Sequence, residues 1–246
     1  GYTVLLGGNI GHPLLPDIEN IKESDVAVVE LSSFQLISMR RSPDIAVVTN
    51  VSPNHLDMHK DMAEYVNAKR NIILHQNGFG KAVLNLDNEI TRKMAEDTRG
   101  ATVMFSRRNK VEYGAYLDGK ALVYADGKKK TEIMTTDDIF ICGMHNVENY
   151  LAAISALYGI VNPENMKYVA KNFHGVEHRI EYIRELDGVA DQIQQALPEP
   201  KRIGVKDRRH LGRHVDHQLQ PLAAKLRFHQ LPDLMQLFIQ TAGLHV

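Results

Sequence analysis

Short apolar runs alternate with helix-periodic segments along residues 1–189. Runs rich in Val, Ile and Leu predict strands, and segments with an apolar residue at every third or fourth position predict helices. We expect strands at 3–6, 25–30, 44–50, 82–86 and 102–105, and helices at 61–76, 88–97, 146–158 and 163–173. Strands that alternate with helices indicate an α/β fold, with a mostly parallel sheet that carries helices on both faces.

Residues 115–134 follow a different pattern. Two Asp-Gly pairs, Asp118-Gly119 and Asp126-Gly127, separate short segments in which apolar and polar residues alternate. Asp-Gly between such segments favours a tight β-hairpin turn. We therefore expect a small antiparallel β meander beside the parallel sheet.

The composition is that of an ordinary globular protein with one or two domains. Of the 246 residues, 43% are hydrophobic and 24% are charged, and the formal net charge is −1. No apolar run reaches the ~20 residues that a membrane helix needs, and no charged-then-apolar leader opens the chain. A net charge this small gives no overall field that favours nucleic acid or membrane binding.

The single cysteine, Cys142, excludes an internal disulfide. This fits a reducing compartment, and we expect a cytoplasmic protein. The apolar neighbours Ile139, Phe140 and Ile141 predict that the thiol is buried and unreactive.

The composition changes abruptly near residue 190. Glutamine occurs twice before Ala190, at Gln35 and Gln76, and eight times after it. Residues 190–246 contain no Asn, Ser or Tyr, and their eight Lys and Arg against five Asp and Glu give a formal charge of +3. We expect a folded domain at 1–189 and an unrelated, poorly defined basic tail at 190–246. The tail is a nucleic-acid-binding appendage, a flexible extension or, as we hypothesise, the product of a frameshift or a joined reading frame.

The segment Glu30-Leu-Ser-Ser-Phe-Gln-Leu36 follows the second predicted strand. A carboxylate and two hydroxyls thus come just beyond the carboxyl end of a strand, the edge where ligands bind in open α/β sheets. Glu30 is a hard oxygen ligand of the kind that Mg²⁺ takes, and the hydroxyls suit phosphate oxygens. Alternatively, the strand runs into a helix that Ser32 or Ser33 caps.

The segment from Asn50 to His59 leaves the third predicted strand and contains His55 and Asp57. It brings two imidazoles and a carboxylate to the same sheet edge as Glu30. His55 and Asp57 are candidates to bind a metal ion or a metal-bound phosphate. The alternative is a solvated polar loop.

Lys69 falls on the apolar side of the next predicted helix. It recurs at helical spacing with Met62, Val66, Ile73 and Gln76. Burying an ammonium group is costly unless the group is paired or neutralised. Lys69 therefore either extends to the edge of the apolar face, or reaches the ligand site and meets a ligand or is chemically modified there.

The segment Gly143-Met-His-Asn146-Val-Glu-Asn149 opens the helix predicted at 146–158. Asn146 and Asn149 share one face near the helix N-terminus. Two carboxamides can read a base edge through paired donor and acceptor groups, although Asn146 is alternatively a simple N-cap. Further along, Arg179 either offers a guanidinium to a phosphate or is a surface charge.

Together these segments resemble the Mur ligase family of ATP-dependent amide-bond-forming enzymes. The matching segments are 7–11, 30–36, 50–57, 68–69, 143–149 and 175–179, in the family's order and spacing. The string from Glu30 to Leu36 is specific to the branch that adds D-glutamate, and the others are shared with further Mur ligases and folylpolyglutamate synthases. The resemblance implies the central-domain fold of that family and a place in peptidoglycan precursor synthesis.

The resemblance implies a role for each matching residue. Asn9 would contact UDP-N-acetylmuramoyl-L-alanine, and Ser32 would lie near the reacting end of this substrate. Glu30 would hold a Mg²⁺ between the ATP phosphates, and His55 would bind a second Mg²⁺. Lys69 would be carbamylated, which replaces its ammonium by an anionic metal ligand. Lys69, His55 and Ser32 are thus the candidate catalytic residues.

The same resemblance also implies which residues bind the nucleotide. Asn146 and Asn149 would hold ATP, and Arg179 would contact its phosphates. The family reaction forms an acyl phosphate from the substrate carboxylate and ATP, and the amine of D-glutamate then attacks it and expels phosphate.

The chain also departs from the family pattern. It contains no G-x-x-x-x-G-K-[ST] phosphate-binding loop, and unrelated sequence begins at Ala190. We therefore expect a truncated piece with little or no ligase activity alone. The alternatives are another Mur ligase or a folylpolyglutamate synthase relative, or a non-catalytic nucleotide-binding remnant.

Overall fold

The computed structural model describes residues 2–9, 13–52, 59–175, 185–186 and 189–190. Its strands are β1 Val4–Gly8, β2 Val26–Glu30, β3 Ile45–Val48, β4 Lys81–Asn85, β5 Ala101–Ser106, β6 Tyr113–Asp118, β7 Ala121–Asp126, β8 Lys129–Thr135, β9 Glu185–Leu186 and β10 Val189–Ala190. Its helices are α1 Ser33–Ile37, α2 Met62–Leu74, α3 Glu89–Lys93, α4 Met144–Leu157 and α5 Pro163–Asn172, with short 3-10 helices at Leu15–Asn20, Met94–Asp97 and Thr136–Asp138. His55, Asp57, Arg179 and residues 191–246 of the tail lie outside the described residues.

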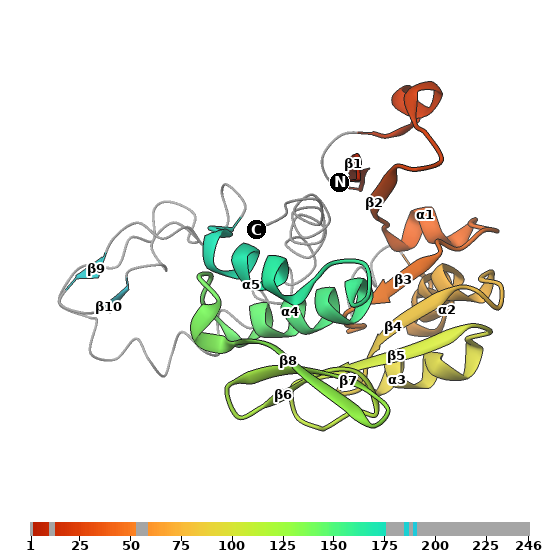
Figure 1. Ribbon diagram of the computed structural model, residues 1–246. Helices are drawn as coiled ribbons and strands as arrows, with labels where there is room; N and C mark the ends of the chain where they lie inside the picture. The colour runs from red at the N-terminus through yellow and green to blue at the C-terminus, as the bar shows by residue number, and fades with distance from the viewer. Residues whose placement is uncertain (1, 10–12, 53–58, 176–184, 187–188, 191–246) are drawn as a thin grey trace.

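Strands β3 to β8 form one six-stranded sheet in sequential order. The pairs from β3 to β6 are parallel, and β6, β7 and β8 pair antiparallel. The expected meander is therefore present, and it continues the parallel sheet directly. Strands β1 and β2 form a separate parallel pair, which stands beside α1 in Figure 1.

Both turns of the meander depend on a glycine with positive φ. Asp118 pairs with Ala121 and Asp126 with Lys129, so each glycine is the first residue of a short loop. Gly119 has φ 63° and Gly127 has φ 61°, a region that favours glycine. The two Asp-Gly signals located the turns correctly, with the aspartate still paired in the strand.

Alternate residues of β4 face opposite layers of the fold. Val83 packs in the core formed by α4 and α5, whereas Ala82 and Leu84 pack on the other face in a core shared with α2. Figure 1 shows α4 and α5 together on one side of the sheet, with α2 on the other. The continuous apolar run in this strand thus follows from burial on both faces.

Among the described helices, α4 is the most deeply buried. It lies against β5 and β6, and its Ser155 hydroxyl accepts a hydrogen bond from Ala115 N at 3.0 Å. Its buried residues include two polar ones in the first two turns, Asn146 and Asn149. In the described part of the chain, no helix has the length and apolarity needed to cross a membrane.

Cys142 is exposed, so the prediction of a buried thiol is wrong. Its neighbour Ile141 is buried, and the backbone N–H of Phe140 donates to Ala170 C=O at 3.0 Å. The chain bends at Ile141, which turns the Ile141 side chain into the core. The next residue, Cys142, lies on the exposed side of this bend.

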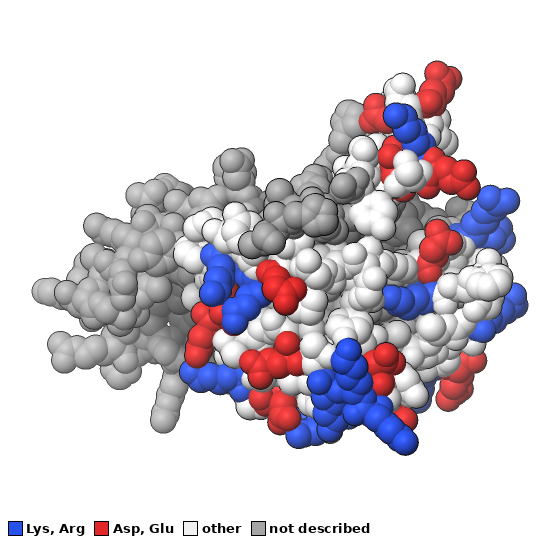
Figure 2. Space-filling model, in the orientation of Figure 1, with Lys and Arg blue, Asp and Glu red and all other residues white. Residues whose placement is uncertain are grey.

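Charged side chains of both signs are interspersed over the face shown in Figure 2. An uncharged region crosses its middle. This face therefore carries no continuous field of one sign, in keeping with the small net charge.

Candidate functional site

Asn9 and Glu30 meet where β1 and β2 end. Gly8 pairs with Glu30, and the backbone N–H of Asn9 donates to Glu30 C=O at 2.8 Å. Gly8 has φ 108°, and a Cβ at this position would lie 2.2 Å from Glu30 O. Only glycine permits this approach, so the sequence fixes two of the predicted site residues next to each other.

Ser32 caps helix α1. Its hydroxyl accepts from Gln35 N at 3.3 Å, and its own N–H donates to Gln35 Oε1 at 2.8 Å, which completes a capping box. The capping interpretation of Ser32 is thus confirmed. Its place near a substrate remains a prediction.

His59 joins α1 to the segment before α2. Its Nε2 lies 2.8 Å from Ser33 Oγ, and both residues are buried. Its ring stacks on Phe34 with centroids 5.0 Å apart and meets Tyr65 edge-on at 5.2 Å. The second imidazole of the predicted polar loop therefore has a packing role that links the two predicted site segments.

Lys69 points inward from α2. Its Nζ lies 5.2 Å from the centroid of the Tyr65 ring. Burial lowers the pKa of Lys69, and the nearby Glu30 carboxylate partly offsets this effect. Glu30 and Lys69 therefore lie close enough for their charges to interact, whereas the approach of Lys69 to a ligand remains a prediction.

The described residues contain no group of three His, Cys, Asp or Glu side chains placed to hold a metal ion. His55 and Asp57, the two further candidates, are outside the described ranges. Their roles remain predictions.

The start of α4 buries two carboxamides. Gly143, with φ 105°, is the N-cap, so the alternative that Asn146 is an N-cap is wrong. Asn146 Nδ2 donates to Cys142 C=O at 2.7 Å, which fixes the orientation of the amide. Asn146 Oδ1 and Asn149 Nδ2 have no hydrogen-bond partner among the described residues, although these side chains are only 2% and 3% exposed.

This pair of unpartnered atoms is informative because buried polar groups are nearly always hydrogen-bonded. One is an acceptor and the other a donor, on neighbouring positions of one helix face. The arrangement is suited to a ligand edge that offers one donor and one acceptor.

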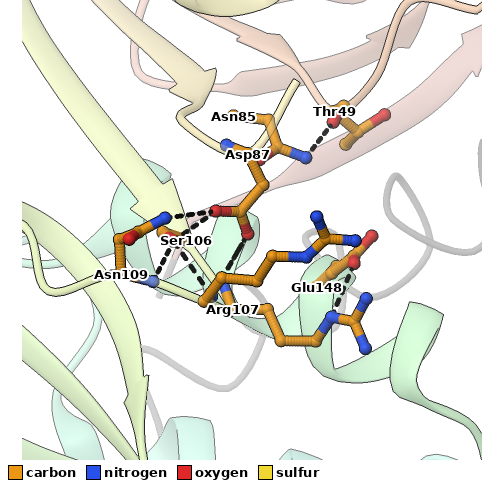
Figure 3. A network of polar contacts seen from close by, with 8 residues as sticks. Thr49, Asn85, Asp87, Ser106, Arg107, Asn109 and Glu148 are labelled. Carbon is orange, nitrogen blue, oxygen red and sulfur yellow. Dashed lines mark hydrogen bonds and ion pairs between the residues drawn. The ribbon is translucent and has the colours of Figure 1, made fainter. Parts of the chain in front are cut away.

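A polar network ties the carboxyl ends of the central strands together (Figure 3). Asn85, at the end of β4, donates from Nδ2 to Thr49 C=O at 2.8 Å and accepts from Asp87 N at 2.9 Å. The Asp87 carboxylate accepts from Ser106 Oγ at 2.7 Å, and Ser106 ends β5. The network therefore fixes the loops that follow β3, β4 and β5.

Asp87 also organises the loop after β5. Its carboxylate accepts from Arg107 N at 2.8 Å and from Asn109 Nδ2 at 3.1 Å. The side chain of Arg107 then reaches Glu148 on α4. Sequence reasoning missed Asp87, Arg107 and Glu148. A signal was available only for Asp87, a polar residue directly after a predicted strand.

The chain matches the family model described as Mur ligase middle domain over residues 9–157. The UDP-N-acetylmuramoylalanine--D-glutamate ligase of Acetivibrio thermocellus is 54% identical over 202 residues, which is 82% of this chain and 43% of that protein. The enzyme of the same name from Clostridium perfringens is 52% identical over 203 residues, with the same coverage of 82% and 43%. The chain thus spans less than half the length of these curated relatives.

Solved structures resemble the fold at low sequence identity. MurF from Acinetobacter baumannii aligns with a TM-score of 0.53 at 14% identity, over 76% of this chain and 49% of that chain. A UDP-N-acetylmuramoyl-L-alanyl-D-glutamate--2,6-diaminopimelate ligase aligns with a TM-score of 0.53 at 18% identity, over 75% and 48%. These likenesses support the α/β fold with its added meander.

Proposed function

The chain belongs to the Mur ligase family, and from this premise we propose that it forms the nucleotide-binding part of an ATP-dependent ligase. The proposed reaction joins D-glutamate to UDP-N-acetylmuramoyl-L-alanine in peptidoglycan precursor synthesis, in the cytoplasm. The choice of substrates follows the names of relatives that are 54% and 52% identical to this chain.

One observation carries the nucleotide part of the proposal. Asn146 offers a buried acceptor, Oδ1, and Asn149 offers a buried donor, Nδ2, and neither has a partner among the described residues. Adenine presents the complementary groups on one edge, an amino donor beside a ring-nitrogen acceptor. Guanine and hypoxanthine carry an oxygen in place of that amino group, so the same two carboxamides disfavour them.

The Lys69 environment supports carbamylation. Only the neutral amine attacks carbon dioxide, and burial lowers the pKa of Lys69, which raises the neutral fraction. The amine nitrogen bonds to the carbon of carbon dioxide and releases one proton, which leaves a carbamate anion. A carbamate beside the Glu30 carboxylate places two anions together, and such a pair requires a cation.

Magnesium fits this requirement because it takes carboxylate oxygens. Glu30 would hold one Mg²⁺ and His55 a second, with the carbamate of Lys69 as a further anionic ligand. These ions would supply charge neutralisation at the ATP phosphates. Asn9 and Ser32 would contact the UDP-linked substrate, and Arg179 the nucleotide phosphates.

In this reaction the protein side chains would act mainly by holding the reacting groups in position. The substrate carboxylate takes the terminal phosphoryl group of ATP and ADP leaves. The amine of D-glutamate then forms the amide bond, and the phosphate leaves. Phosphoryl transfer of this kind depends on alignment and charge stabilisation, which the rigid edge around Asn85 and Asp87 would support.

A domain exchange tests the ligase proposal. Residues 9–157 replace the corresponding part of the Acetivibrio thermocellus relative, and transfer of labelled D-glutamate to UDP-N-acetylmuramoyl-L-alanine is measured. We expect ATP-dependent transfer, with Lys69→Met in the same chimera as the inactive control. A folded chimera that transfers a different amino acid, or none, would contradict the proposal.

A further inference from the structure

The loop after β5 holds Arg107 in a fixed position. The backbone N–H of Arg107 and the side chains of Ser106 and Asn109 all donate to the Asp87 carboxylate. Several charge-assisted hydrogen bonds to one carboxylate fix the backbone from which the Arg107 side chain leaves. Figure 3 shows that this side chain extends to α4.

On α4 the guanidinium meets Glu148. Arg107 Nε lies 2.9 Å from Glu148 Oε1, and the two side chains are only 25% and 16% exposed. Separating such a pair leaves a poorly hydrated charge without its partner, so the contact resists displacement. The ion pair between Lys110 of the same loop and Asp118 of β6 differs in its exposure, because it lies on the protein surface.

Glu148 stands between the two carboxamides along the chain. It precedes Asn149 and follows Asn146 by two positions. The N-cap of this helix, Gly143, forms no side-chain capping bond, so the first turn lacks the usual anchor. The Arg107–Glu148 pair anchors the helix to the sheet edge from the residue that follows this first turn.

We propose that Arg107 is a positioning residue of the nucleotide site, and that it acts through Glu148. The pair sets the distance between the start of α4 and the carboxyl edge of β5, and with it the placement of Asn146 Oδ1 and Asn149 Nδ2 against adenine. This inference rests on the nucleotide site proposed above.

The test measures base selectivity with the full chain. ATP and inosine triphosphate are titrated to millimolar concentration against a fluorescent ATP analogue, and unfolding by urea is followed on the same samples. Arg107→Met should weaken ATP binding about tenfold and inosine triphosphate binding much less, so that the selectivity ratio falls. Glu148→Gln should act in the same way, and Arg107→Lys should restore part of the ratio.

Lys110→Met is the matched control, because it removes an exposed ion pair from the same loop and should leave the ratio unchanged. If Arg107→Met lowers the free energy of unfolding but leaves the selectivity for ATP over inosine triphosphate unchanged, the residue is merely structural and the proposal is wrong. If that variant fails to fold, Glu148→Gln decides by the same criterion. If the unmodified chain does not prefer ATP, the proposed nucleotide site itself fails and the inference with it.

Discussion

Replacing Asn149 by Leu should make the unliganded protein more stable while it weakens ATP binding. Asn149 is 3% exposed and its Nδ2 has no partner among the described residues. A buried amide donor without a partner costs about 1–3 kcal/mol. Leu has the same branching without the polar atoms, so this penalty disappears in the variant, and the gain in helix propensity has the same sign.

ATP binding should change in the opposite direction. Removing the donor leaves an adenine ring nitrogen without a partner in a buried site, at a cost of about 1–2 kcal/mol, or roughly five- to thirtyfold in affinity. A gain in stability combined with a loss of binding is the mark of a polar group that is kept for its ligand.

Asn85→Leu is the matched control. Asn85 is also buried, but it donates to Thr49 C=O at 2.8 Å and accepts from Asp87 N at 2.9 Å. Its replacement should lower the free energy of unfolding by about 1–3 kcal/mol, because two partly buried partners lose their hydrogen bonds. Urea unfolding and ATP titration of both variants give the comparison. If Asn149→Leu destabilises the fold as Asn85→Leu does, and binds ATP unchanged, the reasoning is refuted.

Three further outcomes are expected. Burial lowers the pKa of Lys69 in the folded protein. The free energy of unfolding should therefore rise with pH between that lowered pKa and the ordinary value of 10.5. Urea titrations at several pH values should show this rise, and Lys69→Met should abolish it. Burial raises the pKa of Asp138, but hydrogen bonds from Thr135 and Lys167 outweigh this and hold it at about 2 against 3.8. Asp138→Asn should therefore cost about 2 kcal/mol near neutral pH and little near pH 2, and an equal cost at both would count against the assignment. Cys142 is exposed and its C=O binds Asn146, so saturating ATP should slow its reaction with a maleimide, and an unchanged rate would place the nucleotide elsewhere.

The sequence predicted the fold well because its elements are strongly periodic. The apolar run of β4 and the apolar face of α2 can each be buried in only one arrangement. Gly8 allows β1 to approach β2 so closely that Asn9 meets Glu30. The inward direction of Lys69 followed from the same stripe, since a cation among apolar positions must be paired, neutralised or extended to the edge.

The parts that were missed depend on contacts between distant segments. Asp87 binds residues about twenty positions away, and Arg107 reaches Glu148 on α4. A single charged residue leaves no repeating pattern in the sequence that would identify its partner. Such pairs can therefore be recognised only once the folded structure is known. Cys142 was misplaced for a related reason, because its apolar neighbours gave no sign that the chain bends at Ile141 and leaves Cys142 exposed.

A crystal structure of the full chain with an ATP analogue and Mg²⁺ tests the central claim most directly. The account predicts the amino group of adenine at Asn146 Oδ1 and a ring nitrogen at Asn149 Nδ2. A nucleotide bound elsewhere, with both carboxamides still unpartnered or satisfied by protein atoms, would contradict it.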